Sequence, residues 1–223
     1  MDKYPDQPTA SDKSEPMFNI PFVPLVVGVG MVVLYWAQLG LPDGGMSLAM
    51  RPIDIQNGYL TGLVTHIAVH GGWMHVCMNA AGTVIFGTPV ARDLVRGLGA
   101  IAWLLFYIVC GVIGGLGYAL LSWGDVTPVV GASGAVFGLI GASLRLMAGP
   151  GLLIPLFHPI VLRSSVAWIA VTIISGMLGG LMVGGNAQVA WEAHLCGFFA
   201  GIILIGPFHR LFGMKLPPIL RAD

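Results

Sequence analysis

Four polar side chains that could do hydrolytic chemistry interrupt long apolar runs of this sequence. They are Ser133, His194 and, four residues apart in an earlier run, His75 and Asn79. A serine hydroxyl becomes an effective nucleophile when a neighbouring base takes its proton, and histidine suits that work near neutral pH. Asn79 and His75 carry N–H donors of the kind that stabilises a tetrahedral oxyanion. These residue types therefore indicate nucleophilic hydrolysis, in an unusually apolar setting.

The composition indicates that this setting is a membrane. Of 223 residues, 56% are hydrophobic and only 9% are charged, whereas a soluble domain carries about 25% charged residues. We interpret the chain as a polytopic membrane protein for which the lipid bilayer is a partner. The formal net charge is zero, so no basic face for nucleic acid is expected. The three cysteines fall inside apolar runs, and we interpret them as packing residues.

Six apolar runs are long enough to cross a hydrocarbon core, which takes about 20 helical residues. They lie near residues 20–40, 73–91, 98–122, 129–148, 164–184 and 190–208. The sequence therefore predicts an all-α membrane protein built as a bundle of six transmembrane helices. The connection 41–72 is expected to contain short interfacial helices.

The flanking segments complete the predicted organisation. Residues 1–19 are polar and are expected to form a disordered tail, residues 20–210 to form the membrane domain, and residues 211–223 to form a short cytoplasmic tail. With six spans, nine of the ten lysines and arginines fall on one side, and Arg51 falls on the other. The positive-inside rule then predicts cytoplasmic N- and C-termini.

The four polar residues are predicted to share one depth in the bilayer. Counted back from the next cytoplasmic arginine at about 1.5 Å per helical residue, Ser133 lies about 18 Å away, Asn79 about 20 Å, His194 about 24 Å and His75 about 25 Å. All four fall in the outer half of a core about 30 Å thick. Intramembrane polar groups usually face a bundle interior or a wet cavity, so we expect one polar site.

Glycines indicate how this site is assembled. Gly197 and Gly201 share a helix face with His194, and small residues at this spacing let helices approach closely in lipid. That face is predicted to pack on the glycine-rich run after Gly134. If Ser133 opens a helix, its free backbone N–H can also face an oxyanion. Because no carboxylate is placed to orient His194, we predict a Ser–His dyad without a third member.

The chain resembles the rhomboid family of intramembrane serine proteases over roughly residues 20–210. Three motifs carry the resemblance: His70-x4-His75-x3-Asn79, Gly131-Ala132-Ser133-Gly134 and Ala193-His194-x2-Gly197-x3-Gly201. Each motif is weak alone, but their order and their placement on six spans are specific to this family.

The resemblance implies that Ser133 is the nucleophile and His194 the general base, with His75, Asn79 and the Ser133 amide as the oxyanion hole. It implies a water-filled cavity open to the outside, no cofactor or metal, and single-span transmembrane proteins as substrates. Phe137 replaces a tyrosine that stacks on the catalytic histidine in several members, which keeps the aromatic face and loses the hydroxyl.

The resemblance also suggests how substrate reaches the site, and where the protein resides. It implies a lateral route between the second and fifth spans, with the loop 184–188 as a mobile cap. The expected location is a multi-pass position in a bacterial inner membrane.

Three alternatives are weighed against this interpretation. His66, His70 and His75 have spacing that could hold zinc, but no fourth ligand lies in the segment and Ser133 is left unexplained. A rhomboid-like pseudoprotease would bind membrane helices without cutting them. A transporter is disfavoured because no carboxylate lies in mid-membrane to couple ions.

Overall fold

The computed structural model describes residues 21–182 and 190–215, with side chains described up to residue 177 in the first range. Within these residues the chain is all-helical and has no β-strand, as expected, with isolated bridges at Met50–Val129 and Leu94–Gly213. The long helices are α1 (Phe22–Gln38), α4 (Trp73–Asp93), α5 (Gly99–Leu121), α6 (Ser133–Arg145), α7 (Pro159–Met182) and α8 (Trp191–Phe212). The predictions for residues 1–19, for the cap loop 184–188 and for most of the tail 211–223 lie outside the described residues.

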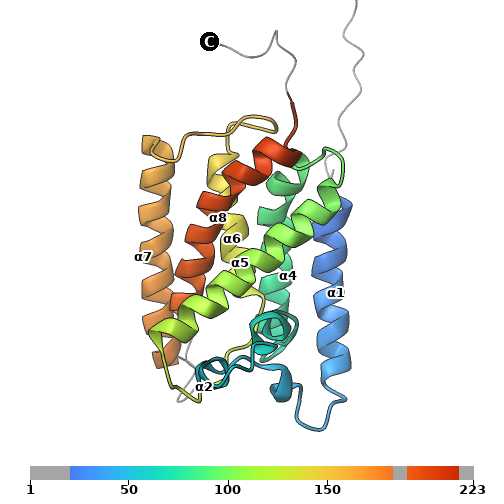
Figure 1. Ribbon diagram of the computed structural model, residues 1–223, viewed down its shortest axis with the longest axis vertical. Helices are drawn as coiled ribbons and strands as arrows, with labels where there is room; N and C mark the ends of the chain where they lie inside the picture. Colours follow the sequence, from blue (N-terminus) through green and yellow to red (C-terminus); the bar gives the residue numbers. More distant parts are fainter. Residues whose placement is uncertain (1–20, 183–189, 216–223) are drawn as a thin grey trace, which may run out of the picture.

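The short helix α6 lies in the middle of the bundle (Figure 1). It packs against α4, α5, α7 and α8, while α1 packs mainly on α4 at one edge. The largest fully buried side chains include Trp103 and Phe106 of α5 and Leu139 of α6. The core therefore surrounds α6, and a polar group at the start of α6 is enclosed by its neighbours.

In the part of the chain that the structure describes, three helices are long and apolar enough to cross a membrane: α5, residues Pro159–Met177 of α7, and α8. Helix α1 is apolar but has 17 residues. Helix α6 has 13 residues and rises about 20 Å, less than the hydrocarbon core. Helix α4 contains many polar and small residues, and helix α6 is short. Judged by length and composition alone, these two helices are therefore weaker candidates for transmembrane spans.

Two helix starts differ from the prediction. The run predicted from residue 129 becomes helical only at Ser133, because Val129 exchanges two backbone hydrogen bonds with Met50 (3.0 and 2.7 Å) and Gly131 has a φ of +116°. Helix α7 begins at Pro159, five residues before the predicted 164. Proline is favoured at the first position of a helix, where no intrahelical N–H is needed.

The connection between α1 and α4 contains short helices, as predicted. They are η1 (Met46–Leu48), α2 (Pro52–Gln56), α3 (Gly62–Thr65) and η2 (His66–Ala68). The Gln38 side chain holds this connection to the end of α1: its Nε2 donates to the His70 carbonyl (2.8 Å), and its Oε1 accepts the His70 N–H (3.0 Å). The Gly131 N–H donates to the His66 carbonyl (2.9 Å), which joins the connection to the segment before α6.

The next connection, between α5 and α6, is also tied to this layer. The Asp125 carbonyl accepts the Ile53 N–H of α2 (3.0 Å). Thr127 donates its backbone N–H and its hydroxyl to the Asp125 carboxylate (2.9 and 2.8 Å), and these bonds lower the pKa of Asp125. The loop that leads into α6 is therefore anchored before the chain reaches Ser133.

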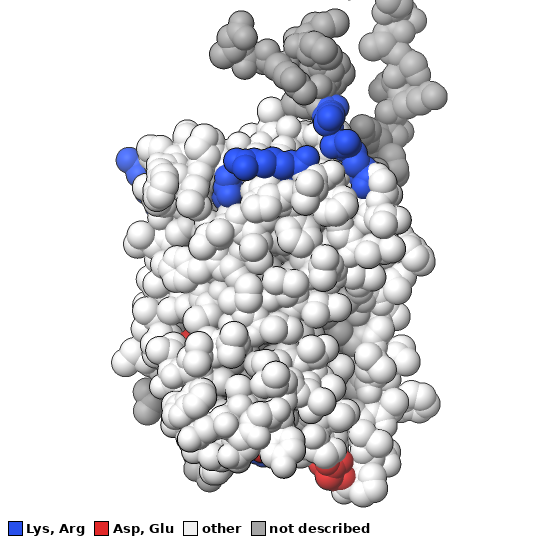
Figure 2. All heavy atoms as spheres, viewed as in Figure 1, with Lys and Arg blue, Asp and Glu red and all other residues white. Residues whose placement is uncertain are grey.

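Basic residues gather at the end of the bundle where α8 ends (Figure 2). Arg92, Arg145 and Arg210 lie in the last turns of α4, α6 and α8. On the face shown in Figure 2, the largest patch of acidic side chains lies at the opposite end, where the α1–α4 connection folds. The apolar bundle therefore has a basic end and an end with acidic groups.

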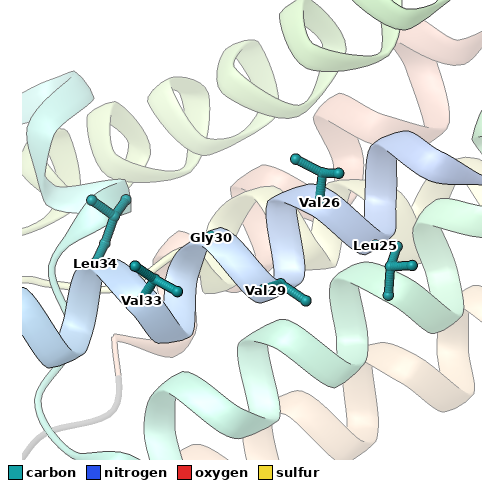
Figure 3. A pocket seen from close by; sticks show the side chains of 6 residues that line it. All are labelled: Leu25, Val26, Val29, Gly30, Val33 and Leu34. Atoms are coloured by element: carbon teal, nitrogen blue, oxygen red, sulfur yellow. The ribbon is translucent and has the colours of Figure 1, made fainter.

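The outer face of α1 is apolar and has a shallow hollow at Gly30 (Figure 3). Val26, Val29 and Val33 around it are about half exposed, and nothing lies within 4 Å of a Cβ placed at Gly30. This face suits contact with hydrocarbon chains. Ser133, His194 and His75 do not lie on this face of α1, because they contact one another's helices and the segment before α6.

Candidate active site

Ser133 and His194 come together in the folded chain. Nε2 of His194 on α8 lies 2.8 Å from Oγ of Ser133 at the start of α6. This is an ordinary hydrogen-bond length for a hydroxyl and an imidazole. Both side chains are partly buried. The pairing predicted from depth and glycine spacing is therefore present as geometry, and the catalytic roles remain a prediction.

Four glycines bring the two helix backbones close enough for this contact. A Cβ added at Gly197 would run into the carbonyl of Gly134, and one added at Gly201 would run into the carbonyl of Gly138. No larger residue fits at these positions unless α6 and α8 move apart. The packing role predicted for Gly134, Gly197 and Gly201 thus has a direct structural reason.

Ser133 is the first residue of α6, and no side chain of the described residues caps this end. The first N–H groups of a helix have no partner inside the helix, so the Ser133 amide is free of the helical hydrogen-bond ladder. Gly131, two residues earlier, has a φ of +116°, which side chains rarely tolerate. The glycine of the Gly-x-Ser motif is therefore required by the backbone conformation of the sharp turn directly before the helix.

His75 lies against this turn. A Cβ added at Gly131 would come within 2.6 Å of Cε1 and Nε2 of the His75 ring, so the absence of a side chain makes room for the imidazole. The Gly71 N–H donates to Nδ1 of His75 (3.3 Å). A neutral ring that accepts at Nδ1 carries its proton on Nε2. The N–H donor of His75 thus lies on the Gly131 side.

Asn79 is buried on the same helix as His75, with 5% of its surface exposed. Its amide Nδ2 donates to the His75 carbonyl (2.9 Å), one turn back along α4. An amide nitrogen has two hydrogens, so this bond uses one of them. In the described part of the chain, no hydrogen bond joins Asn79 directly to Ser133.

Phe137 stacks on the His194 ring. The ring centroids are 4.4 Å apart and the planes differ by 5°. Phe137 lies one helical turn after Ser133, so α6 presents both the hydroxyl and the aromatic face to the same imidazole. The aromatic support that the resemblance implied is present, without a hydroxyl. Within the described residues, no carboxylate hydrogen-bonds to His194, and the Ser–His dyad remains a prediction.

The three histidines of the zinc alternative do not converge. Nδ1 of His66 bonds to the Gly62 carbonyl (2.8 Å), and its ring packs against Gly115 of α5. Both ring nitrogens of His70 are buried without a hydrogen-bond partner among the described residues, and its ring centroid is 5.3 Å from that of His75. Among the described residues, no three histidine, cysteine or acidic side chains group as a metal site.

Two contacts near the site were not anticipated from the sequence. Gln38 holds the backbone of His70, and Trp168 of α7 packs its ring against Phe137 at a centroid distance of 6.4 Å. Gln38 had a recognisable signal, because it is a polar residue at the end of an apolar run. Trp168 had none, since tryptophan is common in membrane helices.

Comparison with known proteins decides the family. A family model described as the Rhomboid domain matches residues 57–211. The chain belongs to the rhomboid family. This rhomboid is 30% identical over 152 residues to a Bacillus subtilis protein named "Putative rhomboid protease YdcA". The match covers 68% of this chain and 69% of YdcA.

Other relatives are longer than this rhomboid. It is 31% identical over 142 residues to RHOMBOID-like protein 9, chloroplastic, of Arabidopsis thaliana, with 60% of this chain and 31% of the relative covered. It is 30% identical over 155 residues to Rhomboid protease GluP of Bacillus subtilis, with 69% of this chain and 28% of GluP covered. The matched part is thus less than a third of these two proteins.

The resemblance stated from three motifs is therefore confirmed at the level of the family. This rhomboid is an integral membrane protein with an all-helical fold, and its relatives support an intramembrane protease at family level.

Proposed function

We propose that this rhomboid is an intramembrane serine endopeptidase that hydrolyses peptide bonds in or near transmembrane segments of other proteins. Ser133 is the nucleophile and His194 the general base. The observation that carries the proposal is the 2.8 Å separation of His194 Nε2 and Ser133 Oγ, across two helices and inside an apolar bundle. A hydroxyl and an imidazole in contact, with the ring held by Phe137, form the minimum machinery for nucleophilic catalysis.

The first half of the reaction follows from this contact. The Ser133 hydroxyl donates to Nε2 of His194, which takes the proton as Oγ attacks the carbonyl carbon of the scissile bond. The C=O π pair moves onto oxygen and forms a tetrahedral oxyanion. When this intermediate collapses, the C–N bond breaks and His194 returns the proton to the leaving amine.

Water completes the reaction. It attacks the acyl ester on Ser133 while His194 takes one of its protons, and the proton then returns to Oγ as the acid product leaves. Without a carboxylate partner, His194 needs another source of orientation. The parallel Phe137 ring 4.4 Å away supplies it by limiting rotation of the imidazole.

The oxyanion is stabilised by three donors in this proposal: the Ser133 backbone N–H, Nε2–H of His75 and the free Nδ2 hydrogen of Asn79. The first is supported by the position of Ser133 at the start of α6, where the helix dipole also favours negative charge. The second is supported by the packing of His75 on Gly131. The third is supported by the place of Asn79 on α4, one helical turn after His75, where the bond to the His75 carbonyl fixes the amide.

We further propose that α1, α4, α5, α6, α7 and α8 all cross the bilayer, with both termini in the cytoplasm of a bacterial cell and the protein in its inner membrane. The gathering of arginines at one end of the bundle supports this orientation. Residues 20–210 then form the protease domain, and residues 1–19 and 211–223 are cytoplasmic tails.

Substrate helices enter laterally between α4 and α7 in this proposal. The small buried share of the α7 span, 11% against 44% for α5 and 39% for α8, supports α7 as a helix that can be displaced. A cross-link between α4 and α7 that leaves cleavage of a transmembrane substrate unchanged would refute this route.

A fluorophosphonate probe tests the chemistry directly. We expect wild-type protein in detergent to be labelled and Ser133→Ala to remain unlabelled. Incubation with a single-span model substrate should then give a cut that is mapped by mass and is lost in Ser133→Ala and His194→Ala. A folded wild type that neither labels nor cuts would instead support a pseudoprotease that binds membrane helices, since some rhomboid-like members are inactive.

A further inference from the structure

Four aromatic rings from four different helices form a continuous row that ends at the proposed base. Phe86 of α4 meets Trp168 of α7 edge to face, with centroids 5.6 Å apart and planes at 86°. Trp168 meets Phe137 of α6 at 6.4 Å and 86°, and Phe137 stacks on His194 of α8 at 4.4 Å. Edge-to-face and stacked geometries at these separations are the favourable ones for aromatic pairs.

Helix α7 is otherwise weakly attached to the bundle. Only 11% of its span is buried, against 44% for α5 and 39% for α8. In Figure 1 it stands at the outer edge of the bundle. Its buried hydroxyls bond within the helix, Ser165 to the Val161 carbonyl and Thr172 to the Trp168 carbonyl (both 2.7 Å). Both hydroxyls are therefore hydrogen-bonded inside α7, and these two bonds do not attach the helix to its neighbours.

Trp168 is the largest side chain that attaches α7 to the bundle near the site, and Ile169 of the same helix packs on the same apolar cluster. Trp168 packs at the margin of this cluster, which is formed by α6 and α8, together with Phe86 and Phe137. The indole of Trp168 therefore contacts Phe86 of α4 on one side and Phe137, the ring that stacks on His194, on the other.

Building on the proposed function, we propose that Trp168 is a positioning residue for His194. It acts through Phe137 and thereby couples the place of α7 to the orientation of the imidazole. Separation of α7 from α4 must break the Phe86–Trp168 contact, and an indole that moves with α7 no longer backs Phe137. The imidazole then gains freedom to tilt, and a tilt lengthens the 2.8 Å contact through which Ser133 loses its proton.

The test separates chemistry from substrate entry by using a small reagent. The full chain in detergent is reacted with a fluorophosphonate, which needs no passage for a substrate helix, and the maximal labelling rate and half-saturating concentration are measured. We expect Trp168→Ala to lower the maximal rate about threefold to tenfold, the size of effect that one aromatic contact supports. The half-saturating concentration should stay unchanged, and Trp168→Phe should restore most of the rate. Val166→Ala, an exposed change on α7, is the matched control.

A double-mutant cycle with Phe137→Leu asks whether Trp168 acts through Phe137. We expect Trp168→Ala to have little further effect on the labelling rate in a Phe137→Leu background, because the link has already been removed. Thermal unfolding of each variant identifies folded preparations, and Trp168→Leu replaces Trp168→Ala if the latter does not fold.

Three outcomes would overturn the inference: a wild-type labelling rate in folded Trp168 variants, a changed half-saturating concentration alone, or additive effects of the two substitutions. A wild-type labelling rate together with a lowered unfolding temperature would show that Trp168 contributes only to the stability of the fold. Absence of labelling in the wild type would instead overturn the proposed function, and this inference with it, so the two failures are distinguishable.

Discussion

His209 and Asp93 are paired at the basic end of the bundle, although they lie 116 residues apart in the chain. Nδ1 of His209 on α8 lies 3.0 and 2.9 Å from the two carboxylate oxygens of Asp93 at the end of α4. The Asp93 side chain is fully buried and also accepts the Gly151 N–H from the α6–α7 connection (3.0 Å). One carboxylate therefore joins three segments far from the proposed active site.

We expect Asp93→Ala to destabilise the protein strongly, because the Gly151 N–H and the His209 ring lose their partner in a buried place. Removing one member of a buried pair costs about 3–5 kcal/mol. Unfolding of detergent-solubilised protein by heat or SDS measures the loss. Asp54→Ala is the matched control, since Asp54 is 40% exposed in its pair with Arg51, and exposed pairs contribute less than about 1 kcal/mol. Equal losses in the two variants would contradict the structural role of Asp93.

Replacement of Ser133 or His194 by alanine should reduce substrate cleavage by more than about a thousandfold, because each change removes one half of the proton-transfer pair. Cleavage of a single-span substrate, followed on gels and by mass, measures this. Ser143→Ala is the control: its hydroxyl bonds to the Ile140 carbonyl of its own helix (2.8 Å), and activity should persist. Cleavage that survives in Ser133→Ala would refute the nucleophile.

Asn79→Ala should lower turnover by about a hundredfold or more, with KM little changed, if the amide binds charge that develops only in the transition state. Steady-state kinetics on a transmembrane substrate separates the two parameters. Met78→Ala, at the neighbouring position and 67% exposed, should leave both unchanged. A rise in KM at constant turnover would mean that Asn79 binds substrate and does not stabilise the oxyanion.

Gly201→Val should push α6 and α8 apart, because even a Cβ at this position collides with the Gly138 backbone. Overpacking of this kind costs about 1–3 kcal/mol, and it should lengthen the Ser133–His194 contact. We expect reduced thermal stability and loss of fluorophosphonate labelling in the fraction that stays folded. Gly30→Val places a side chain in the open hollow of α1 and should be neutral in both measurements. A fully labelled Gly201→Val would show that close approach of these helices is not required.

The apolar runs, the glycine spacing and the common depth of Ser133 and His194 were all readable from the sequence. They were readable because burying a polar group in hydrocarbon is costly, so such a residue stands out in an apolar run and signals a partner. The same physics predicted a helical membrane protein, whereas the rhomboid family was indicated by the resemblance of three motifs. The roles of Ser133, His194, His75 and Asn79 remain predictions for the experiments above.

The tertiary structure decided features that depend on contacts between distant segments. Helix α6 starts at Ser133 and not at 129 because Met50, some eighty residues upstream, pairs with Val129. The contacts of Asp93 with His209 and of Trp168 with Phe137 form only when α4, α6, α7 and α8 pack together. Hydropathy reports how a residue interacts with its solvent, lipid or water. Which side chains meet is set by packing between helices, where shape at each contact, such as the missing side chain of Gly131 beside His75, determines the fit.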